Sequence, residues 1–244
     1  MNNLGDAERA VLLAFADDEH LMGQRHTEWI GVAPFLEEDL AFASIGQDEL
    51  GHAAMLYELL AGGNADQIAF WRSAAEYRSC WLVEARCTDW AEAIVRHWLY
   101  DEAELLRWQG LASSASADLR GIAARALAEE TYHRRHANAL LDALIRDGAA
   151  TERLRRAFAE LAPLAVALFE SPAAAAGADP SIIGPPLESL RAPWVASVIT
   201  RFGGIDDLTS TATAQQGRTV RSMHFDEMYS RMREVILLDP SATW

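Results

Sequence analysis

QDELGH, residues 47–52, contains a glutamate and a histidine three positions apart, Glu49 and His52. On an α-helix two residues at this spacing lie on one face, so a carboxylate and an imidazole can reach the same point. One Glu-x-x-His motif by itself is more often a solvated helix surface than a pair of metal ligands. Its meaning therefore depends on what the rest of the chain adds to it.

The motif occurs a second time in EETYHRRH, residues 129–136, where Glu130 and His133 form it. Superposing the two copies also pairs Asp48 with Glu129, so each copy reads acid-Glu-x-x-His. A helical bundle that binds two metal ions in its core takes a Glu-x-x-His from each of two helices and a further carboxylate from each of the other two. The repeat therefore predicts two halves of one metal centre.

This arrangement requires one acid on each of two partner helices. Glu19 lies 30 residues before Glu49, and Asp101 lies 29 residues before Glu130. Both acids continue apolar stripes with helical spacing, where a carboxylate is costly to bury unless something pairs with it. We expect six metal ligands, namely Glu19, Glu49, His52, Asp101, Glu130 and His133. The alternative is a buried polar network that keeps these side chains without a metal.

Composition and charge place the chain among ordinary globular proteins. Half of its 244 residues are hydrophobic, which is enough for one substantial domain spanning residues 1–244. The formal net charge is −15 and the isoelectric point is near 4.8. Because nucleic-acid binding needs a positive field, we expect no nucleic-acid partner.

The sequence predicts neither an export signal nor a membrane-spanning segment. Cys80 and Cys87 are too few for a disulfide scaffold and lack a metal-binding spacing. The first twenty residues contain acids where a secretory signal would be basic and then apolar. The most apolar stretch, LAPLAVALF at residues 161–169, is too short to cross a bilayer. We expect a cytoplasmic protein without membrane contact.

Helical periodicity dominates the sequence, and alternation typical of strands is almost absent. The pattern predicts an all-α fold with a four-helix bundle at about residues 4–147 and a helical extension at about residues 150–244. Gly62 and Gly63 end the second helix, and an alanine-rich loop follows the fifth. The expected helices cover about residues 4–31, 36–61, 89–114, 117–147, 150–170 and 187–202, with a seventh in MHFDEMYSRMREVIL at 223–237.

The motifs resemble a known family. Glu19, WIGVAP at 29–34 and IGQDELGHA at 45–53 look like the first half-site of the catalytic subunit of the bacterial phenylacetyl-CoA 1,2-epoxidase family. WLYD at 98–101 followed by EETYHRRHA at 129–137 is similar to the second half-site. The resemblance covers about residues 10–145 and implies a ferritin-like diiron bundle whose ligands fall on the six residues named above.

The resemblance also implies an activity. Two iron ions would reduce O2 with electrons from a separate reductase, and one oxygen atom would be transferred to an organic substrate such as an aromatic acyl-CoA. Manganese or a mixed metal pair is the alternative content of the site. The length of the chain and its ending, from GRTVRSMHFDEMYSRM to Trp244, look more like the smaller, structural subunit of that complex. We therefore expect a homo-oligomer or a heterodimer with a homologous bundle subunit.

Three functions are compatible with these features. The first is a diiron monooxygenase-type oxidoreductase, the second a non-catalytic scaffold subunit that pairs with a catalytic homologue, and the third a ferroxidase-like metal-binding protein without organic substrate. The complete ligand set favours the first over the second. The roughly 95 residues beyond the fourth helix distinguish the chain from short ferritin-like bundles and argue against the third.

Two further groups of side chains belong to the predicted site. Asp48 and Glu129 are placed to accept the free N–H of the histidine in the opposite motif and so to orient it. His26, Trp29 and Trp98 are the candidates for a substrate pocket beside the metals. Solvated helix surface is the alternative for the two acids, and ordinary core packing is the alternative for the other three.

Overall fold

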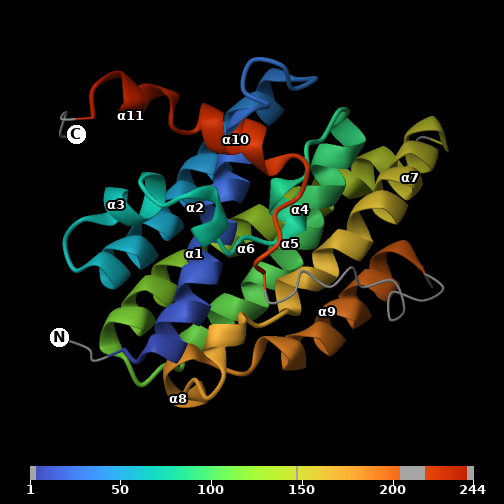
Figure 1. Cartoon of the computed structure of the whole chain (residues 1–244). Helices are drawn as coiled ribbons and strands as arrows, with labels where there is room; N and C mark the ends of the chain where they lie inside the picture. The colour runs from blue at the N-terminus through green and yellow to red at the C-terminus, as the bar shows by residue number, and fades with distance from the viewer. Residues whose placement is uncertain (1–3, 147, 204–217, 241–244) are drawn as a thin grey trace.

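The computed structural model describes residues 4–146, 148–203 and 218–240. Trp244 and Gly217, which belong to the ending compared above, lie outside these residues. Within them all regular structure is helical, as predicted (Figure 1). The helices are α1 Asp6–Thr27, α2 Leu36–Ala61, α3 Ala65–Phe70, η1 Ala74–Glu76, α4 Trp81–Glu84, α5 Trp90–Leu111, α6 Ala117–Ile145, α7 Gly148–Ala165, η2 Val166–Phe169, η3 Ala173–Ala175, α8 Pro180–Ile183, α9 Leu187–Phe202, α10 Phe225–Arg231 and α11 Glu234–Leu238.

Two helical hairpins, α1–α2 and α5–α6, form the bundle (Figure 1). The side chain of Asp89 caps α5 by accepting a hydrogen bond from the backbone N–H of Glu92, and Ser116 caps α6 in the same way. Gly62 ends α2 in the left-handed conformation with φ 65°, which a residue without a Cβ adopts easily. These local signals place both Glu-x-x-His motifs in the middle of long helices.

Glycines let α1 and α2 approach each other closely beside the predicted site. A Cβ on Gly46 would lie 3.1 Å from the Cβ of His26 and 3.2 Å from the carbonyl oxygen of Gly23. A Cβ on Gly23 would lie 2.8 Å from the side chain of Leu50. A larger residue at either position would push the helices apart, so this contact fixes the separation of the first two helices at the metal motifs.

The helix boundaries differ from the expected ones mainly at the ends. The first helix stops at Thr27, and Ile30 beyond it is 49% exposed, so it does not extend the buried stripe. The seventh predicted helix is two short ones, α10 and α11, because the chain turns at residues 232–233. The alanine-rich segment is a loop with one short 3-10 turn, η3.

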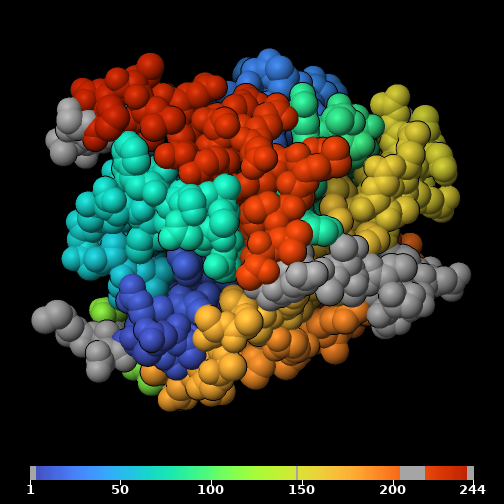
Figure 2. Space-filling view, in the orientation of Figure 1, coloured from blue at the N-terminus to red at the C-terminus, as the bar shows by residue number. Residues whose placement is uncertain are grey.

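The C-terminal extension packs on the bundle instead of forming a separate body. Leu154, Phe158 and Leu161 of α7 and Trp194 of α9 are buried in one apolar cluster with α5. The α10 and α11 segment lies beside the residues that follow α3 (Figure 2). There Phe225 packs against Tyr77 with ring centroids 5.4 Å apart.

One helical stretch is longer and more apolar than the sequence led us to expect. Residues Gly148–Ala175 meet the length and composition of a membrane span, with a mean hydropathy of 1.3 over the most apolar window. More than half of that window, 56%, is buried inside the fold. Because the apolar face of α7 packs on α5 in the core, the stretch has the properties of a buried core helix.

Candidate metal centre

The four bundle helices bring nine acidic and histidine side chains together in the core. Each helix supplies at least one acid and one histidine, and every one of the nine is 0% exposed. The set comprises Glu19 and His26 of α1, Glu49 and His52 of α2, His97, Asp101 and Glu104 of α5, and Glu130 and His133 of α6. All six predicted ligands are therefore among the buried residues of one cluster.

Two groups within the cluster are compact enough to hold an ion each. The potential ligand atoms of Glu19, His52 and Glu104 lie within 4.8 Å of one another, and so do those of Glu49, Asp101 and Glu104. Glu104 belongs to both groups. It was not among the ligands predicted from the sequence, although Asp101 of the same helix was.

The two motif histidines are oriented alike. Nδ1 of His52 faces the cluster, 3.2 Å from Glu19 and 3.5 Å from Glu104, while its Nε2 lies 2.7 Å from Oε2 of Glu129. Nδ1 of His133 lies 3.0 Å from Glu130, and its Nε2 lies 3.2 Å from Oδ2 of Asp48.

Asp48 and Glu129 thus contact the histidine of the opposite motif, on the side away from the cluster. An acid at this position fixes which ring nitrogen remains free to bind a metal.

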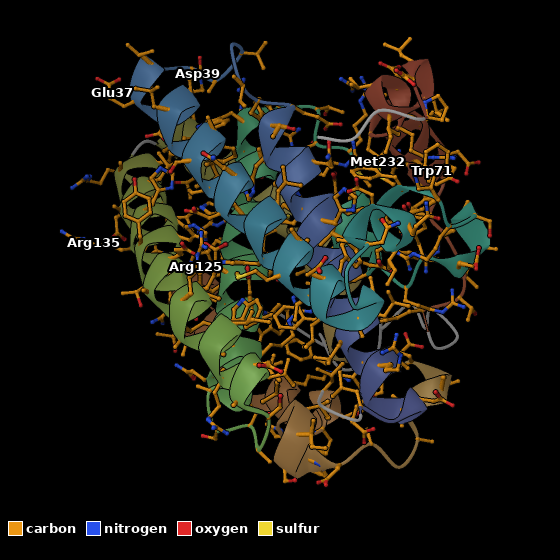
Figure 3. All side chains as sticks on the ribbon, turned by 90° about the vertical axis from the view of Figure 1, so that its left-hand side faces the viewer. Glu37, Asp39, Trp71, Arg125, Arg135 and Met232 are labelled. Carbon is orange, nitrogen blue, oxygen red and sulfur yellow. The ribbon has the colours of Figure 1, made fainter. Side chains whose placement is uncertain are left out.

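The outer face of α6 carries basic side chains. Arg125 and Arg135, on either side of the motif in the sequence, project to the outer surface of the helix (Figure 3).

Two further histidines contact carboxylates of the cluster. Nδ1 of His26 lies 3.3 Å from Glu49, and Nδ1 of His97 lies 3.0 Å from Asp101. Their rings meet edge to face with centroids 4.9 Å apart. Beyond them the polar contacts continue towards the surface, because Nε2 of His97 lies 3.4 Å from His136, whose other nitrogen is 2.9 Å from Glu38.

The three residues predicted to form a pocket lie in different surroundings. His26 is fully buried against Phe42, and Trp29 packs edge to face on Trp90. The indole N–H of Trp98 donates to the side chain of Asn138 of α6, and its ring packs edge to face on Phe202 of α9. Trp98 lines a surface pocket there together with Glu102, Arg134, Asn138, Pro193 and Arg201. A pocket shared by the three stays a prediction.

Burial is the main cause of the unusual acidity of the cluster. It raises the pKa of Glu19, Glu49, Asp101 and Glu130 well above the ordinary range, and the charge of Glu104 adds to the increase in each case. Burial also lowers the pKa of His97 to about 3 and that of His26 well below its usual value. Without cations, burial therefore favours the protonated form of these four acids.

Glu104 and His52 behave in the opposite way. Burial by itself would raise the pKa of Glu104, but hydrogen bonds from His52, Glu19 and Trp108 outweigh it and lower the pKa. Burial would likewise lower the pKa of His52, yet its contacts with Glu104 and Glu19 raise it to about 12. Glu104 is therefore the carboxylate of the cluster that is held in its charged form.

Many polar atoms of the cluster lack a hydrogen-bond partner within the described residues. Buried polar atoms are rarely left so, because each costs about 1–3 kcal/mol. The atoms are both carboxylate oxygens of Glu49, Asp101 and Glu130, Oε2 of Glu104, both ring nitrogens of His26, and Nδ1 of His97 and of His133. A set of converging oxygens and imidazole nitrogens fits divalent transition-metal ions.

Glu104 was missed because only one acid was expected from this helix, and His97 because histidine ligands were expected only from the Glu-x-x-His motifs. The residues His97, Asp101, Glu104 and Trp108 follow the spacing 4, 3, 4 and thus share one face of α5. This spacing can be read from the sequence, and it would have identified both Glu104 and His97 as neighbours of Asp101. His97 was not among the predicted site residues, whereas it is fully buried beside Asp101.

Comparison with known proteins identifies the family of this chain. Residues 3–244 match the family described as phenylacetic acid catabolic protein. One subunit of the 1,2-phenylacetyl-CoA epoxidase of Escherichia coli (strain K12) is 28% identical over 249 residues, covering 96% of this chain and 98% of that protein. The match runs over the bundle and the extension alike, so it includes both the buried cluster and the helices packed around it. The chain therefore belongs to the phenylacetic acid catabolic protein family.

Proposed function

We propose that this chain is the metal-bearing subunit of a phenylacetyl-CoA epoxidase-type oxidoreductase, which uses O2 to oxygenate an aromatic acyl-CoA. The observation that carries the proposal is the buried cluster of unpartnered carboxylate oxygens contributed by the bundle helices. A polar network that only stabilised the fold would satisfy these atoms with hydrogen bonds. Two iron ions would satisfy them by coordination, with manganese or a mixed pair as the alternative.

The charges around the cluster support two divalent ions. Its five carboxylates carry five negative charges when ionised, and two divalent ions supply four positive ones. Arg107 lies 3.9 Å from Glu19. Arg107 and Arg218 carry two positive charges, and Asp18, which contacts both, carries one negative charge, so the three residues together add one net positive charge. The buried region is then close to neutral, which is what a low-dielectric core requires. The proposed ligands are Glu19, Glu49, His52, Asp101, Glu130 and His133.

The chain's own residues hold these ligands in place and exclude water. The hydroxyl of Tyr100 donates a 2.7 Å hydrogen bond to Glu19, and the indole N–H of Trp108 donates one of 2.9 Å to Glu104. The aromatic rings of Phe15 and Trp108, with centroids 4.4 Å apart, close the apolar end of the cluster. Bound there in the ferrous state, an iron pair supplies the two electrons with which O2 is reduced.

The name of the relative supports the choice of substrate and partners. Because that protein is one subunit of an epoxidase, we place this chain in a complex with other subunits and with a reductase that restores the electrons. The overall reaction consumes O2, two electrons and two protons for each substrate, and yields one oxygenated product and water. We place the protein in the cytoplasm, where CoA thioesters and reductants are available.

The test combines metal content with a single turnover. We expect the full chain to bind two iron ions and, after anaerobic reduction, to convert phenylacetyl-CoA to a product with one atom from isotopically labelled O2. Glu49→Ala and His133→Ala are expected to lose the iron and the product together, because each removes a ligand. Glu58→Ala, a matched change of an exposed residue on α2, should leave both unchanged.

The other outcomes identify the alternative functions. A folded chain without iron would contradict the proposal and support the scaffold function, which also suits a relative that is one subunit among several. Rapid O2 consumption during iron loading, without oxygenated product, would support the ferroxidase-like function instead. Metal analysis and mass spectrometry of the product separate the three.

The acids behind the motif histidines give a second prediction. Glu129→Gln and Asp48→Asn each replace a carboxylate that contacts Nε2 of a motif histidine, so we expect metal affinity to fall about 10–100-fold. Competition with a chromophoric chelator measures the dissociation constants. Asp142→Asn is the control, because Asp142 lies on the same helix as Glu129 and pairs with Arg201 away from the cluster. Unchanged constants in both variants would exclude a role for these acids in metal binding.

A further inference from the structure

Glu104 has no counterpart in the other half of the repeat. Asp101 follows Glu19 by 82 residues, and the same offset pairs Glu104 with Met22. Both side chains are fully buried at equivalent positions of α1 and α5. The first hairpin therefore presents a thioether where the second presents a carboxylate, and the repeated arrangement of ligands does not account for Glu104.

The position of Glu104 is also unusual within the cluster. It is the one residue common to the two compact groups of potential ligands in the described part of the chain. One carboxylate oxygen of Glu19 and one of Glu104 lie within 4.8 Å of each other and of a ring nitrogen of His52. A divalent cation bound between these two side chains would be attracted by both carboxylates.

The two oxygens of Glu104 have different surroundings. Oε1 accepts from the indole of Trp108 at 2.9 Å and lies 3.5 Å from Nδ1 of His52. Oε2 is buried without a partner among the residues that the structure describes. The indole therefore fixes the plane of the carboxylate while the second oxygen remains free for a ligand. The matched position in α1 leaves nothing of this kind, because the side chain of Met22 offers no oxygen.

We infer that Glu104 is a seventh metal ligand, shared by the two metal positions and supplied by one half of the bundle only. The inference rests on the proposed function in that it requires the chain to bind two metal ions. It assigns Glu19 and His52 to the first position and Glu49 and Asp101 to the second, with Glu104 between them. The centre is then asymmetric, although the Glu-x-x-His motifs that build it are a repeat.

Metal titration of the full chain tests the inference. The metal-free protein is titrated with Fe2+ without oxygen, and the two dissociation constants are measured. Glu104→Gln keeps an acceptor for Trp108 but is a poor ligand, so both constants should rise at least about tenfold. Glu19→Gln should weaken mainly the first position, and Asp101→Asn mainly the second. Glu102→Gln is the matched control on the same helix, since Glu102 pairs with Arg134 instead.

A second readout reports on the bridge itself. Two ions that share a carboxylate are magnetically coupled, so we expect the coupled electron paramagnetic resonance signal of the wild-type metal pair to change in Glu104→Gln. Far-ultraviolet circular dichroism of each variant establishes that it is folded. Wild-type constants and an unchanged signal in Glu104→Gln would overturn the inference, as would weakening of one position only. Absence of metal from the wild type would instead overturn the proposed function.

Discussion

Arg218→Met is expected to lower the free energy of unfolding by about 3–5 kcal/mol, which is the usual cost of breaking a buried ion pair by removing one partner. The guanidinium of Arg218 is 0% exposed, and its Nη1 lies 2.8 Å from Oδ2 of Asp18. It also donates hydrogen bonds to the carbonyl oxygens of Leu168, Glu170 and Arg78. Methionine fills part of the volume but leaves these acceptors without their donor.

The effect should reach the metal centre as well as the fold. Asp18 precedes the proposed ligand Glu19 and is shared by Arg218, Arg107 and the backbone N–H of Cys80. When Arg218 is removed, Arg107 is the remaining cation for this carboxylate. Because Arg107 also lies 3.9 Å from Glu19, we expect metal affinity to change together with stability.

Urea unfolding of metal-free protein, followed by circular dichroism, measures the first effect. Arg86→Met is the matched control, because Arg86 is 57% exposed and lies 3.5 Å from Glu227 at the surface. Exposed pairs of this kind contribute about 0–1 kcal/mol. A loss in Arg218→Met as small as that of the control would show that the C-terminal segment does not stabilise the bundle through this residue.

The contrast between Arg218 and the motif residues explains what the sequence could predict. Glu49 and His52 are three residues apart on one helix, so their common direction follows from helical geometry alone. Asp18 and Arg218 are 200 residues apart, and neither lies in a pattern that points to the other. The contact exists because residues far apart in the chain are brought to α1 by the packing of the extension, which no local periodicity encodes.

The candidate site shows the same division. The six ligands predicted from spacing all lie in the buried cluster. Glu104 shares a face with Asp101, and one acid per helix was too strict an expectation to include it. Trp98 was expected to line a pocket beside the metals, yet its side chain contacts Asn138 of α6 and Phe202 of α9. Helical spacing predicts a direction, and tertiary contacts decide what lies there.

Metal-free protein is expected to lose stability steadily between about pH 7 and about pH 9. The folded state raises the pKa of Glu19, Glu49, Asp101 and Glu130, chiefly through burial, from an ordinary value near 4.5 or below. As the pH rises, each such acid ionises in the unfolded chain before it ionises in the folded one. The folded state thus binds more protons, and stability falls with rising pH by up to about 1.4 kcal/mol per pH unit for each proton.

The histidines fix the window in which this sign holds. His26 and His97 have lowered pKa values, so they stabilise the folded state less as the pH falls below 6.5, their ordinary value. Above about pH 7 both histidines are neutral in the folded and in the unfolded state, so they no longer contribute to the pH dependence of the free energy of unfolding. His52, with its pKa raised to about 12, binds a proton only in the folded state throughout the window. It therefore acts in the same direction as the four acids.

Metal should remove most of this dependence, because ions replace the protons on the ligands. We expect urea midpoints that fall from pH 7 to pH 9 with chelator present and change much less when the protein is loaded with Mn2+, which tolerates this range without oxidation. Metal binding should release protons, measurable as heats that depend on the buffer in titration calorimetry. Glu49→Gln cannot ionise in either state, so its metal-free midpoint should fall less steeply. Urea midpoints that do not change with pH in the metal-free wild type would mean that the acids of the cluster are ionised and paired in some other way. That result would contradict a metal-free cluster whose buried carboxyl groups are protonated.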